Sequence, residues 1–199
     1  MRRPSLWKRV LRYPDTVVES KWFDEAAGAV VISVRPARRA QQRCGRCGQR
    51  CPWYDRGRGR RRWRMLDVAA RLAYLEADLP RVRCSQHGVV VAAEPWARHG
   101  AGHTRDFDSE VAWLTRQMSK SAVCLLLRIA WATVGAIITR VVAEADAQAG
   151  DRLNGLRRIG IDEISYKRGH RYLTVVVDHA TGRLVWVGEG RSKATLSRF

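Results

Sequence analysis

Two short pairs of cysteine and histidine constrain the fold of this chain more than any other feature. Cys44-x-x-Cys47 is separated by 36 residues from Cys84-x-x-His87. Two tight turns brought together across a hairpin can place four such side chains at the corners of a tetrahedron, the geometry of structural zinc. Thiolate and imidazole ligands favour zinc over magnesium or calcium. The spacing therefore predicts a small domain folded around Zn²⁺, with four protein ligands and no open position for chemistry.

The other cysteines and histidines lack ligand spacing. Cys51 lies near the first pair and could replace one ligand, but we prefer a small buried residue at this position. Cys124 lies in an apolar segment and is expected in a core. The sequence starts Met1-Arg2-Arg3-Pro4 and leads into no apolar signal region, so a reducing cytoplasm and metal-bound thiols are expected. Four single histidines are expected in loops: His99, His103, His170 and His179.

The charge of the chain predicts a polyanionic partner. Its 199 residues include 37 Lys and Arg against 19 Asp and Glu, a formal net charge of +18. The stretch 35–71 alone contains 13 arginines and two aspartates, interleaved with Trp53, Tyr54 and Trp63. This mixture favours a folded surface that faces double-stranded DNA over a solvated loop or a site for an anionic membrane. Guanidinium groups predicted to contact phosphates belong to Arg56, Arg58, Arg60, Arg61, Arg62 and Arg64.

Patterns of β-structure cover the first half of the chain. Residues 17–24 and 29–36 are rich in β-branched and aromatic side chains and are joined by a turn at 25–28, where Gly28 can adopt positive φ. Residues 73–79 alternate apolar and polar side chains, as in a half-buried strand. The segment 94–104 has the composition of a linker. We expect an N-terminal hairpin over 1–40 and a zinc-binding domain over 41–93.

The pattern becomes helical between residues 105 and 149. Apolar side chains recur at helical spacing from Phe107 to Met118, and two further apolar helices follow, the last with Thr133 as its expected N-cap. The segments 121–128 and 133–145 fit a helix-turn-helix, whose second helix enters the DNA major groove. Thr139 and Arg140 would then face the bases or phosphates. A plain helical hairpin is the alternative, because the turn lacks the usual glycine.

The same region contains the most apolar segment of the chain. Residues 122–138 carry a single charge, Arg128. A membrane span needs about 20 apolar residues, and an arginine at its centre costs several kcal/mol of insertion free energy. The sequence therefore predicts no membrane partner.

The last segment returns to β-structure. Three strands are expected over 158–165, 172–178 and 183–187, followed by a helix that Ser192 would cap. Asp162 lies inside the first strand, which has a buried composition. Three strands and a helix, with an acid on the first strand, begin a ribonuclease-H-like fold, whose enzymes hold two Mg²⁺ ions between three carboxylates. A salt-bridged strand acid is the alternative, and Glu163 would face the opposite side.

Taken in order, these motifs resemble insertion-sequence transposases of the ISL-three family over nearly the whole chain. The resemblance implies an α+β, multi-domain protein with a β-rich zinc-binding domain, a helix-turn-helix region for transposon ends at 105–149, and an incomplete DDE catalytic domain at 156–199. It also implies that Asp162 is the first catalytic acid. The motifs that carry the resemblance are the Cys44–His87 turns, the arginines of 55–63, Trp131-Ala132-Thr133-Val134-Gly135, Arg158-Ile159-Gly160-Ile161-Asp162-Glu163-Ile164-Ser165, Tyr172-Leu173-Thr174-Val175-Val176-Val177-Asp178-His179 and Thr181-Gly182-Arg183.

The chain departs from the family at its catalytic end. Asp178 lies at a hairpin turn rather than on a later strand, so we do not assign it as the second acid, and residues 189–199 contain no helical third acid. Family members are about twice as long. We therefore expect an N-terminal part of a transposase that binds terminal inverted repeats but does not cut DNA, with Mg²⁺ needed only by a complete catalytic domain. A transposition repressor and an RNA-binding zinc protein are the alternatives. The sequence leaves open whether the chain forms a homodimer. We expect it in the bacterial cytoplasm, associated with the nucleoid.

Overall fold

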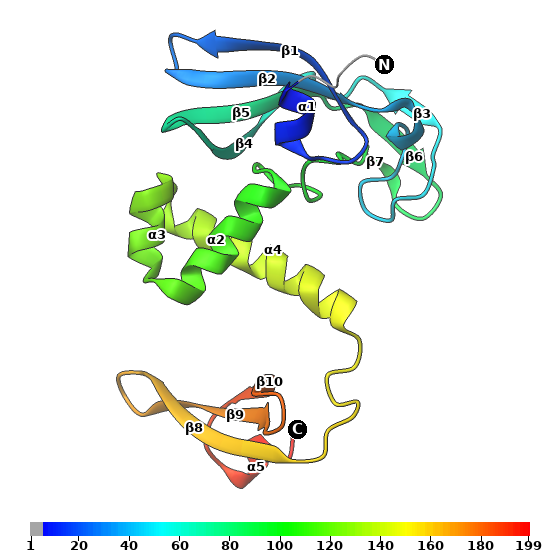
Figure 1. Ribbon diagram of the computed structural model, residues 1–199. Coiled ribbons are helices and arrows are strands. Elements are labelled where there is room, and N and C mark those ends of the chain that lie inside the picture. Colours follow the sequence, from blue (N-terminus) through cyan, green and yellow to red (C-terminus); the bar gives the residue numbers. More distant parts are fainter. Residues whose placement is uncertain (1–5) are drawn as a thin grey trace. The chain divides into compact units, whose positions relative to one another are not determined.

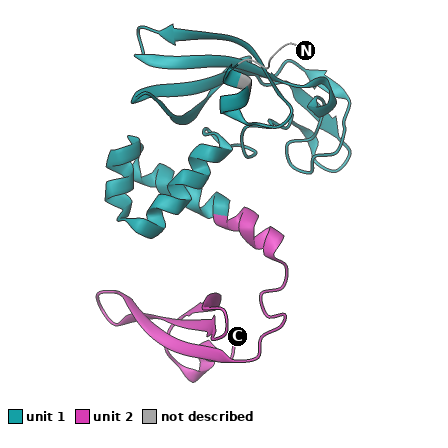
Figure 2. Ribbon diagram, in the orientation of Figure 1, with its two compact units in different colours: residues 1–141 teal, residues 142–199 magenta. Residues whose placement is uncertain are grey.

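The computed structural model describes residues 6–199, and these residues form a mixed α+β protein with three separate sheets and five α-helices (Figure 1). This agrees with the predicted fold class. The first five residues, where the start of the chain was interpreted, lie outside the described part. The chain divides into two compact units, residues 1–141 and 142–199 (Figure 2), which are described separately below.

The largest sheet of the first unit has four strands in the order β1-β2-β5-β4. The predicted hairpin is confirmed, and Gly28 has φ +58° in its turn. The strand β2 also pairs in parallel with β5, so the N-terminal hairpin belongs to the same sheet as the arginine-rich segment. One sheet thus joins segments from both sides of the boundary that the sequence suggested at residue 40. The elements of this layer are α1 (Leu6–Leu11), β1 (Thr16–Asp24), β2 (Ala29–Pro36), β4 (Arg60–Val68) and β5 (Arg71–Asp78).

The core of this sheet explains why an arginine-rich segment forms a strand. In β4 the side chains of Trp63 and Met65 point into the core while arginines alternate with them. Trp63 packs edge-on against Trp96, with ring centroids 5.4 Å apart. Because Trp96 is fully buried, the segment 94–104 is part of the packed domain and not the linker that its composition predicts. Aromatic burial of this kind outweighs the turn-like composition around it.

A second, smaller sheet holds three short strands in the order β3-β6-β7. The strands β6 and β7 form an antiparallel hairpin in which Cys84 pairs with Gly88. Its own core is a cluster around Val82 and three cysteines. The elements are η1 (Arg38–Ala40), β3 (Trp53–Asp55), β6 (Arg81–Cys84) and β7 (Gly88–Val91).

Three helices complete the first unit: α2 (Arg105–Gln117), α3 (Lys120–Leu127) and α4 (Trp131–Ala149), whose last turns belong to the second unit. The helix α2 is capped by the Thr104 hydroxyl, which accepts a hydrogen bond from the Phe107 amide at 3.4 Å. Thr133 does not cap α4, because the helix begins two residues earlier. The helices share one apolar core: Phe107, Val111, Leu114, Val123, Val134 and Ile137.

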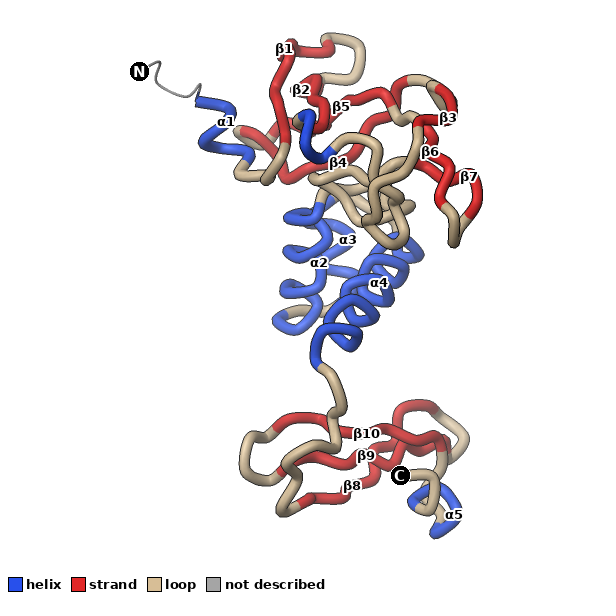
Figure 3. Tube along the Cα trace, turned by 90° about the vertical axis from the view of Figure 1, so that its right-hand side faces the viewer, coloured by secondary structure: helices blue, strands red, loops and turns tan. Residues whose placement is uncertain are grey.

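The second unit contains the three-stranded antiparallel sheet β10-β9-β8 and a short helix, α5 (Figure 3). As predicted, Ser192 caps this helix, and its hydroxyl accepts a hydrogen bond from the Thr195 amide at 3.1 Å. The meander followed by a helix is the order expected for the start of a ribonuclease-H-like domain. The strands are β8 (Ile159–Lys167), β9 (Arg171–Asp178) and β10 (Arg183–Glu189), and the helix is Lys193–Leu196.

Across residues 6–199 the structure contains no single helix long and apolar enough to cross a membrane. The apolar segment noted in the sequence is divided between α3 and α4. These two helices reach the required length only as a pair that is bent by 105° at the break between them.

Candidate metal centre and nucleic-acid interface

The structure brings all four sequence-predicted metal ligands into one cluster. Ligand atoms of Cys44, Cys47, Cys84 and His87 all lie within 4.8 Å of one another. The Sγ atoms of Cys47 and Cys84 are 3.7 Å apart, and His87 Nδ1 lies 3.7 Å from Cys44 Sγ and 3.6 Å from Cys84 Sγ. A tetrahedron with metal–sulfur bonds of about 2.3 Å has edges close to these distances. The cluster therefore fits a four-coordinate metal with soft ligands.

Two turns position these ligands. After Cys44 the chain folds back on itself, because the Gly48 amide donates to the Cys44 carbonyl at 2.8 Å and Gly48 has φ +72°. The Arg46 amide points to Cys44 Sγ at 3.4 Å, as expected for a turn that stabilises thiolate charge. Cys84 ends β6 and His87 lies in the turn before β7. The hydrogen bond with His87 is the main cause that lowers the pKa of the Cys84 thiol to about 6.

Cys51 does not belong to the four-residue cluster. Its thiol points to the Gln49 carbonyl at 3.3 Å, and the residue is buried. Burial raises the pKa of this thiol, which favours the neutral form over a metal-binding thiolate. The structure therefore favours the interpretation of Cys51 as a small buried residue. Cys124 is half-buried against the helical core, as expected.

The helices α3 and α4 have the geometry of a helix-turn-helix. Three residues separate them, and the chain bends by 105° at this break, within the usual range for that motif. Arg128 occupies the left-handed conformation, φ +56°, that glycine often takes in such turns. Its guanidinium pairs with Asp67, which also pairs with Arg64. An ion pair to β4 thus holds a turn whose sequence lacks glycine.

The predicted DNA-binding arginines fall into two groups. Arg56 and Arg58 are exposed and make no side-chain hydrogen bond or ion pair within residues 6–199. Arg60 and Arg62 pair with Glu76, at 3.1 and 2.8 Å, on the exposed face of the sheet. The guanidinium of Arg61 donates to the Ala101 carbonyl at 2.8 Å.

Arg64 is buried instead of facing a phosphate. It is 7% exposed, donates to the Met65 carbonyl, pairs with Asp67 and lies over the Phe107 ring. It therefore joins the sheet to α2, contrary to its predicted role. Alternation places Arg64 on the face of β4 opposite Trp63 and Met65, and nothing in the sequence indicated that Phe107 of α2 would cover that face.

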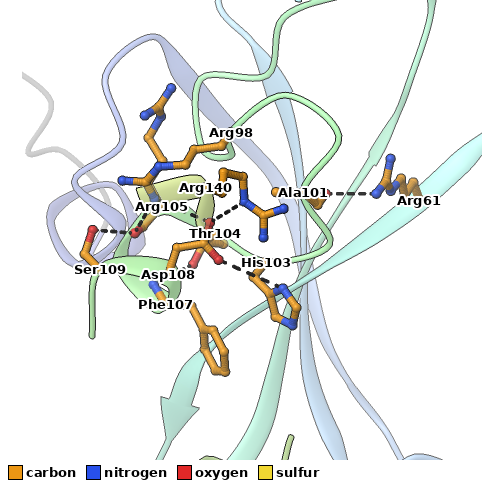
Figure 4. Close-up of polar contacts among 10 residues, drawn as sticks. All are labelled: Arg61, Arg98, Ala101, His103, Thr104, Arg105, Phe107, Asp108, Ser109 and Arg140. Carbon is orange, nitrogen blue, oxygen red and sulfur yellow. Dashed lines mark hydrogen bonds and ion pairs between the residues drawn. The ribbon is translucent and has the colours of Figure 1, made fainter. Parts of the chain in front are cut away.

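Arg140 is also engaged inside the protein (Figure 4). Its Nε lies 3.2 Å from Oδ2 of Asp108, a fully buried acid on α2, and Arg98 reaches the same oxygen at 3.4 Å. His103 Nδ1 lies 4.0 Å from the other carboxyl oxygen, and burial lowers the pKa of this histidine. Arg140 thus holds α4 against α2, whereas the sequence predicted an outward-facing side chain. Thr139 is exposed on α4, as predicted.

The sequence indicated Tyr54 as part of a DNA-facing surface, but not the two arginines of the zinc-cluster sheet (β3-β6-β7) that flank it. The Tyr54 ring is 42% exposed and has the guanidinium groups of Arg81 and Arg83 at 5.3 and 5.2 Å from its centroid. The two arginines are alternate residues of one strand and therefore share a face, which is a signal that the sequence carries. Such cation–aromatic groups are common on surfaces that bind nucleic acids.

Asp162 lies on β8, the edge strand of the second unit, and is exposed rather than buried. Its carboxylate accepts a hydrogen bond from the Glu163 amide at 2.7 Å. Asp178 accepts from the Thr181 hydroxyl at 2.7 Å and the Ala180 amide at 3.0 Å, so it stabilises the β9–β10 turn. Within residues 6–199 no carboxylate cluster suited to a metal is formed around Asp162.

The geometry defines a class of protein first: a helix-turn-helix protein with a Cys₃His metal site and a strongly basic surface. Comparison with known families then shows three matches in chain order. Residues 40–87 match the zinc-finger of transposases IS204, IS1001, IS1096 and IS1165, residues 93–142 match the helix-turn-helix domain of transposase family ISL3, and residues 159–199 match a transposase domain of the same family. Over these three successive segments the chain is similar to transposases of the ISL3 family.

The curated relatives are also transposases of insertion sequence elements. The transposases for insertion sequence element IS1557 from two strains of Mycobacterium tuberculosis are 58% identical over 188 residues, covering 92% of this chain. The transposase for IS1001 of Bordetella parapertussis is 25% identical over 180 residues, or 90% of the chain. The chain spans only 42 to 43% of the length of these relatives. No solved structure matches significantly.

Proposed function

We propose that residues 1–199 bind duplex DNA at the terminal inverted repeats of an insertion sequence, with α4 in the major groove. The observation that carries this proposal is the 105° bend between α3 and α4 within the segment that matches a transposase helix-turn-helix domain. A helical hairpin would run back antiparallel and would present no single leading helix. A bend near a right angle leaves α4 free to lead into a groove while α3 braces it.

The proposed contacts are of two kinds: contacts to phosphates, which position the protein on DNA, and contacts to base edges, which select the sequence. Arg56 and Arg58, whose guanidinium groups are free, would contact phosphates and give affinity without sequence choice. Thr139, exposed on α4, is the sequence-predicted residue that remains available to a base edge. Arg60 and Arg62 would contact phosphates from the exposed sheet face and Arg61 from the opposite side of the strand, each at the expense of its present partner.

We further propose that the Cys₃His cluster holds a structural Zn²⁺. The donor types and their mutual distances fit this metal, and four protein ligands leave no position for a substrate. Metal binding would supply folding free energy to the small sheet, whose remaining core consists of few residues.

Asp162 is proposed as the first acid of the DDE site, and Mg²⁺ as the ion that a complete site would bind. The described residues alone do not fit a two-metal site, because Asp162 has no clustered carboxylates beside it. We therefore propose that residues 1–199 bind DNA without cutting it, and this favours a second candidate function, a repressor that occupies transposon ends. Nucleoid association and a homodimer on paired ends belong to the same proposal.

The test is a binding titration of purified 1–199 with labelled inverted-repeat duplex, scrambled duplex and RNA, at several salt concentrations. Preference for the inverted repeat over both competitors supports the proposal, and RNA that competes equally well contradicts it. A second assay adds Mg²⁺ and a supercoiled transposon-end plasmid. Reproducible end cleavage that Asp162→Ala abolishes would contradict the proposed lack of catalysis.

A further inference from the structure

A cavity of about 500 Å³ lies in the first unit, between residues of the four-stranded sheet and of the zinc-cluster sheet. It is lined by residues of β2, β3, β6 and the end of β5, which are labelled in Figure 1, and by residues 92–94, which follow β7. Its volume falls within the range of small-molecule sites. Neither the metal cluster nor the helix-turn-helix uses this space. Its lining includes Arg35, Trp53, Arg56, Leu79, Glu94 and Trp96.

A buried carboxyl group lines the cavity. Glu94 is 7% exposed, and its side chain makes no ion pair or hydrogen bond with another side chain within residues 6–199. Burial raises the pKa of Glu94 to about 7. Its own backbone amide and the charge of Arg61 act on this carboxyl, but the effect of burial is larger than both, and a further partner of such a group is often a ligand. The cavity wall also contains the fully buried Trp96, whose Nε1 has no hydrogen-bond partner among the described residues.

The rim of the cavity has the opposite electrostatic character. Arg56 is exposed and unpaired within the described chain, and Trp53 is 50% exposed beside it. Both belong to β3 and the turn that follows. Gly57 in this turn has φ +67°, and a Cβ there would lie 2.1 Å from the Leu79 carbonyl oxygen. Only glycine allows so close an approach, so the turn holds Arg56 against the cavity wall.

We propose that this cavity binds an extrahelical nucleobase that carries an exocyclic amino group. Glu94 accepts a hydrogen bond from the amino group, Trp53 stacks on the base at the rim, and Arg56 contacts the flanking phosphate. Adenine, cytosine and guanine offer this donor, whereas thymine does not. The inference rests on the proposed DNA binding and adds a second site for the same substrate, distinct from α4.

The charge arrangement favours a nucleotide over other ligands. A free phosphate or an acidic peptide would be repelled by Asp78 and by the ionised form of Glu94, while a small cation would be repelled by Arg35 and Arg56. A nucleotide that points its base inward presents N–H donors to the carboxyl group and leaves its phosphate outside with Arg56. Unpaired bases are also the least costly to extrude from a duplex.

The experiment is a fluorescence-anisotropy titration of purified 1–199 with labelled duplexes. One duplex is fully paired and five carry a single unpaired nucleotide: adenine, cytosine, guanine, thymine or an abasic site. We expect the amino-bearing bases to bind about tenfold more tightly than thymine or the abasic site. Glu94→Gln should abolish this preference. Trp53→Ala should reduce the affinity increase over the abasic duplex for every unpaired base. The control Glu25→Gln, at an exposed residue, should change neither the preference nor the affinity increase.

Each result decides between the two proposals. Normal binding of the paired duplex with no preference among unpaired bases overturns the cavity inference and leaves the proposed function intact. Failure to bind any duplex, with zinc content retained as a check on folding, overturns both. If Glu94→Gln unfolds, the inference is decided by the wild-type base series together with Trp53→Ala, because Trp53 is half-exposed and lies outside the core clusters.

Discussion

Strands β2 and β8 both carry β-branched apolar side chains, but these side chains lie in different environments. β2 lies between β1 and β5, and Ile32 and Val34 are almost completely buried. β8 has only β9 as a neighbour, and Ile159, Ile161 and Ile164 are 41 to 48% exposed. The difference teaches that an apolar strand sequence specifies a strand, while its burial depends on how many partners the fold supplies.

The largest effect is expected from removing a metal ligand, because it should unfold part of the first unit only. Structural zinc contributes about 10–16 kcal/mol of apparent binding free energy in small zinc domains. Cys84→Ser should release the metal and remove the fold of the small sheet while the β8–β10 sheet persists. Elemental analysis and hydrogen exchange measure both effects. Zinc retained at the wild-type level in the variant contradicts the assignment, and Cys124→Ser on α3 is the matched control.

A large loss of stability is also expected at the buried acid that joins two helices of the first unit. Asp108→Ala leaves Arg98 and Arg140 without their carboxylate and should cost about 3 kcal/mol. Arg140→Ala should lower stability and weaken specific and nonspecific DNA binding by similar factors. Denaturant titration and binding to both duplexes test this. A selective loss of specific binding with unchanged stability would restore Arg140 to a base-reading role.

A matched pair of isoleucines tests the comparison of β2 with β8 directly. Ile32→Ala creates a cavity in the core and should cost about 2–5 kcal/mol. Ile161→Ala removes a side chain that is 48% exposed and should change stability by less than about 0.5 kcal/mol. Chemical denaturation, followed by probes in each unit, measures both values. Equal costs would show that β8 is buried in solution.

Stability of the first unit should depend on pH through Glu94. Its pKa rises from 4.5 to about 7 in the folded protein, so the folded state binds more protons than the unfolded state between these values. The favourable contribution is complete below pH 4.5 and is lost as pH rises to about 7, a loss of roughly 3 kcal/mol. Glu94→Gln should flatten the curve. Denaturation midpoints at closely spaced pH values measure the slope, and an identical slope in the variant would refute the assignment.

The smallest expected effect is on the salt dependence of DNA binding, which should differ between the exposed Arg58 and the buried Arg64. Arg58→Ala should reduce the slope of log affinity against log salt by about 0.9, the value for one phosphate contact. Arg64→Ala should leave this slope unchanged and lower stability, because its guanidinium is engaged with Asp67 inside the fold. Binding isotherms at four salt concentrations distinguish the two. A slope change for Arg64→Ala alone would reverse the assignment.

Much of this architecture could be predicted where the signal is local. Ligand spacing indicated the Cys/His cluster, alternation indicated β5, and helical periodicity located α2 to α4 within a few residues. The structure differs from the sequence-based expectation where segments far apart in the sequence pack or pair with each other. The segment 94–104 packs as core because Trp96 finds Trp63, and the hairpin at 16–36 joins the larger sheet because β5 supplies a partner.

The sequence by itself determined the donor set of the metal cluster, the helix-turn-helix segments and the position of Asp162 on a strand, because spacing and periodicity are properties of neighbouring residues. Only the tertiary structure decided which arginines remain free. Glu76 and Asp108 are far from Arg62 and Arg140 in sequence, and an ion pair depends on the distance between charges in space. The carboxyl group of Glu94 became a candidate ligand-binding group for the same reason, since the fold buries it in a cavity wall without a side-chain hydrogen bond or ion pair among residues 6–199.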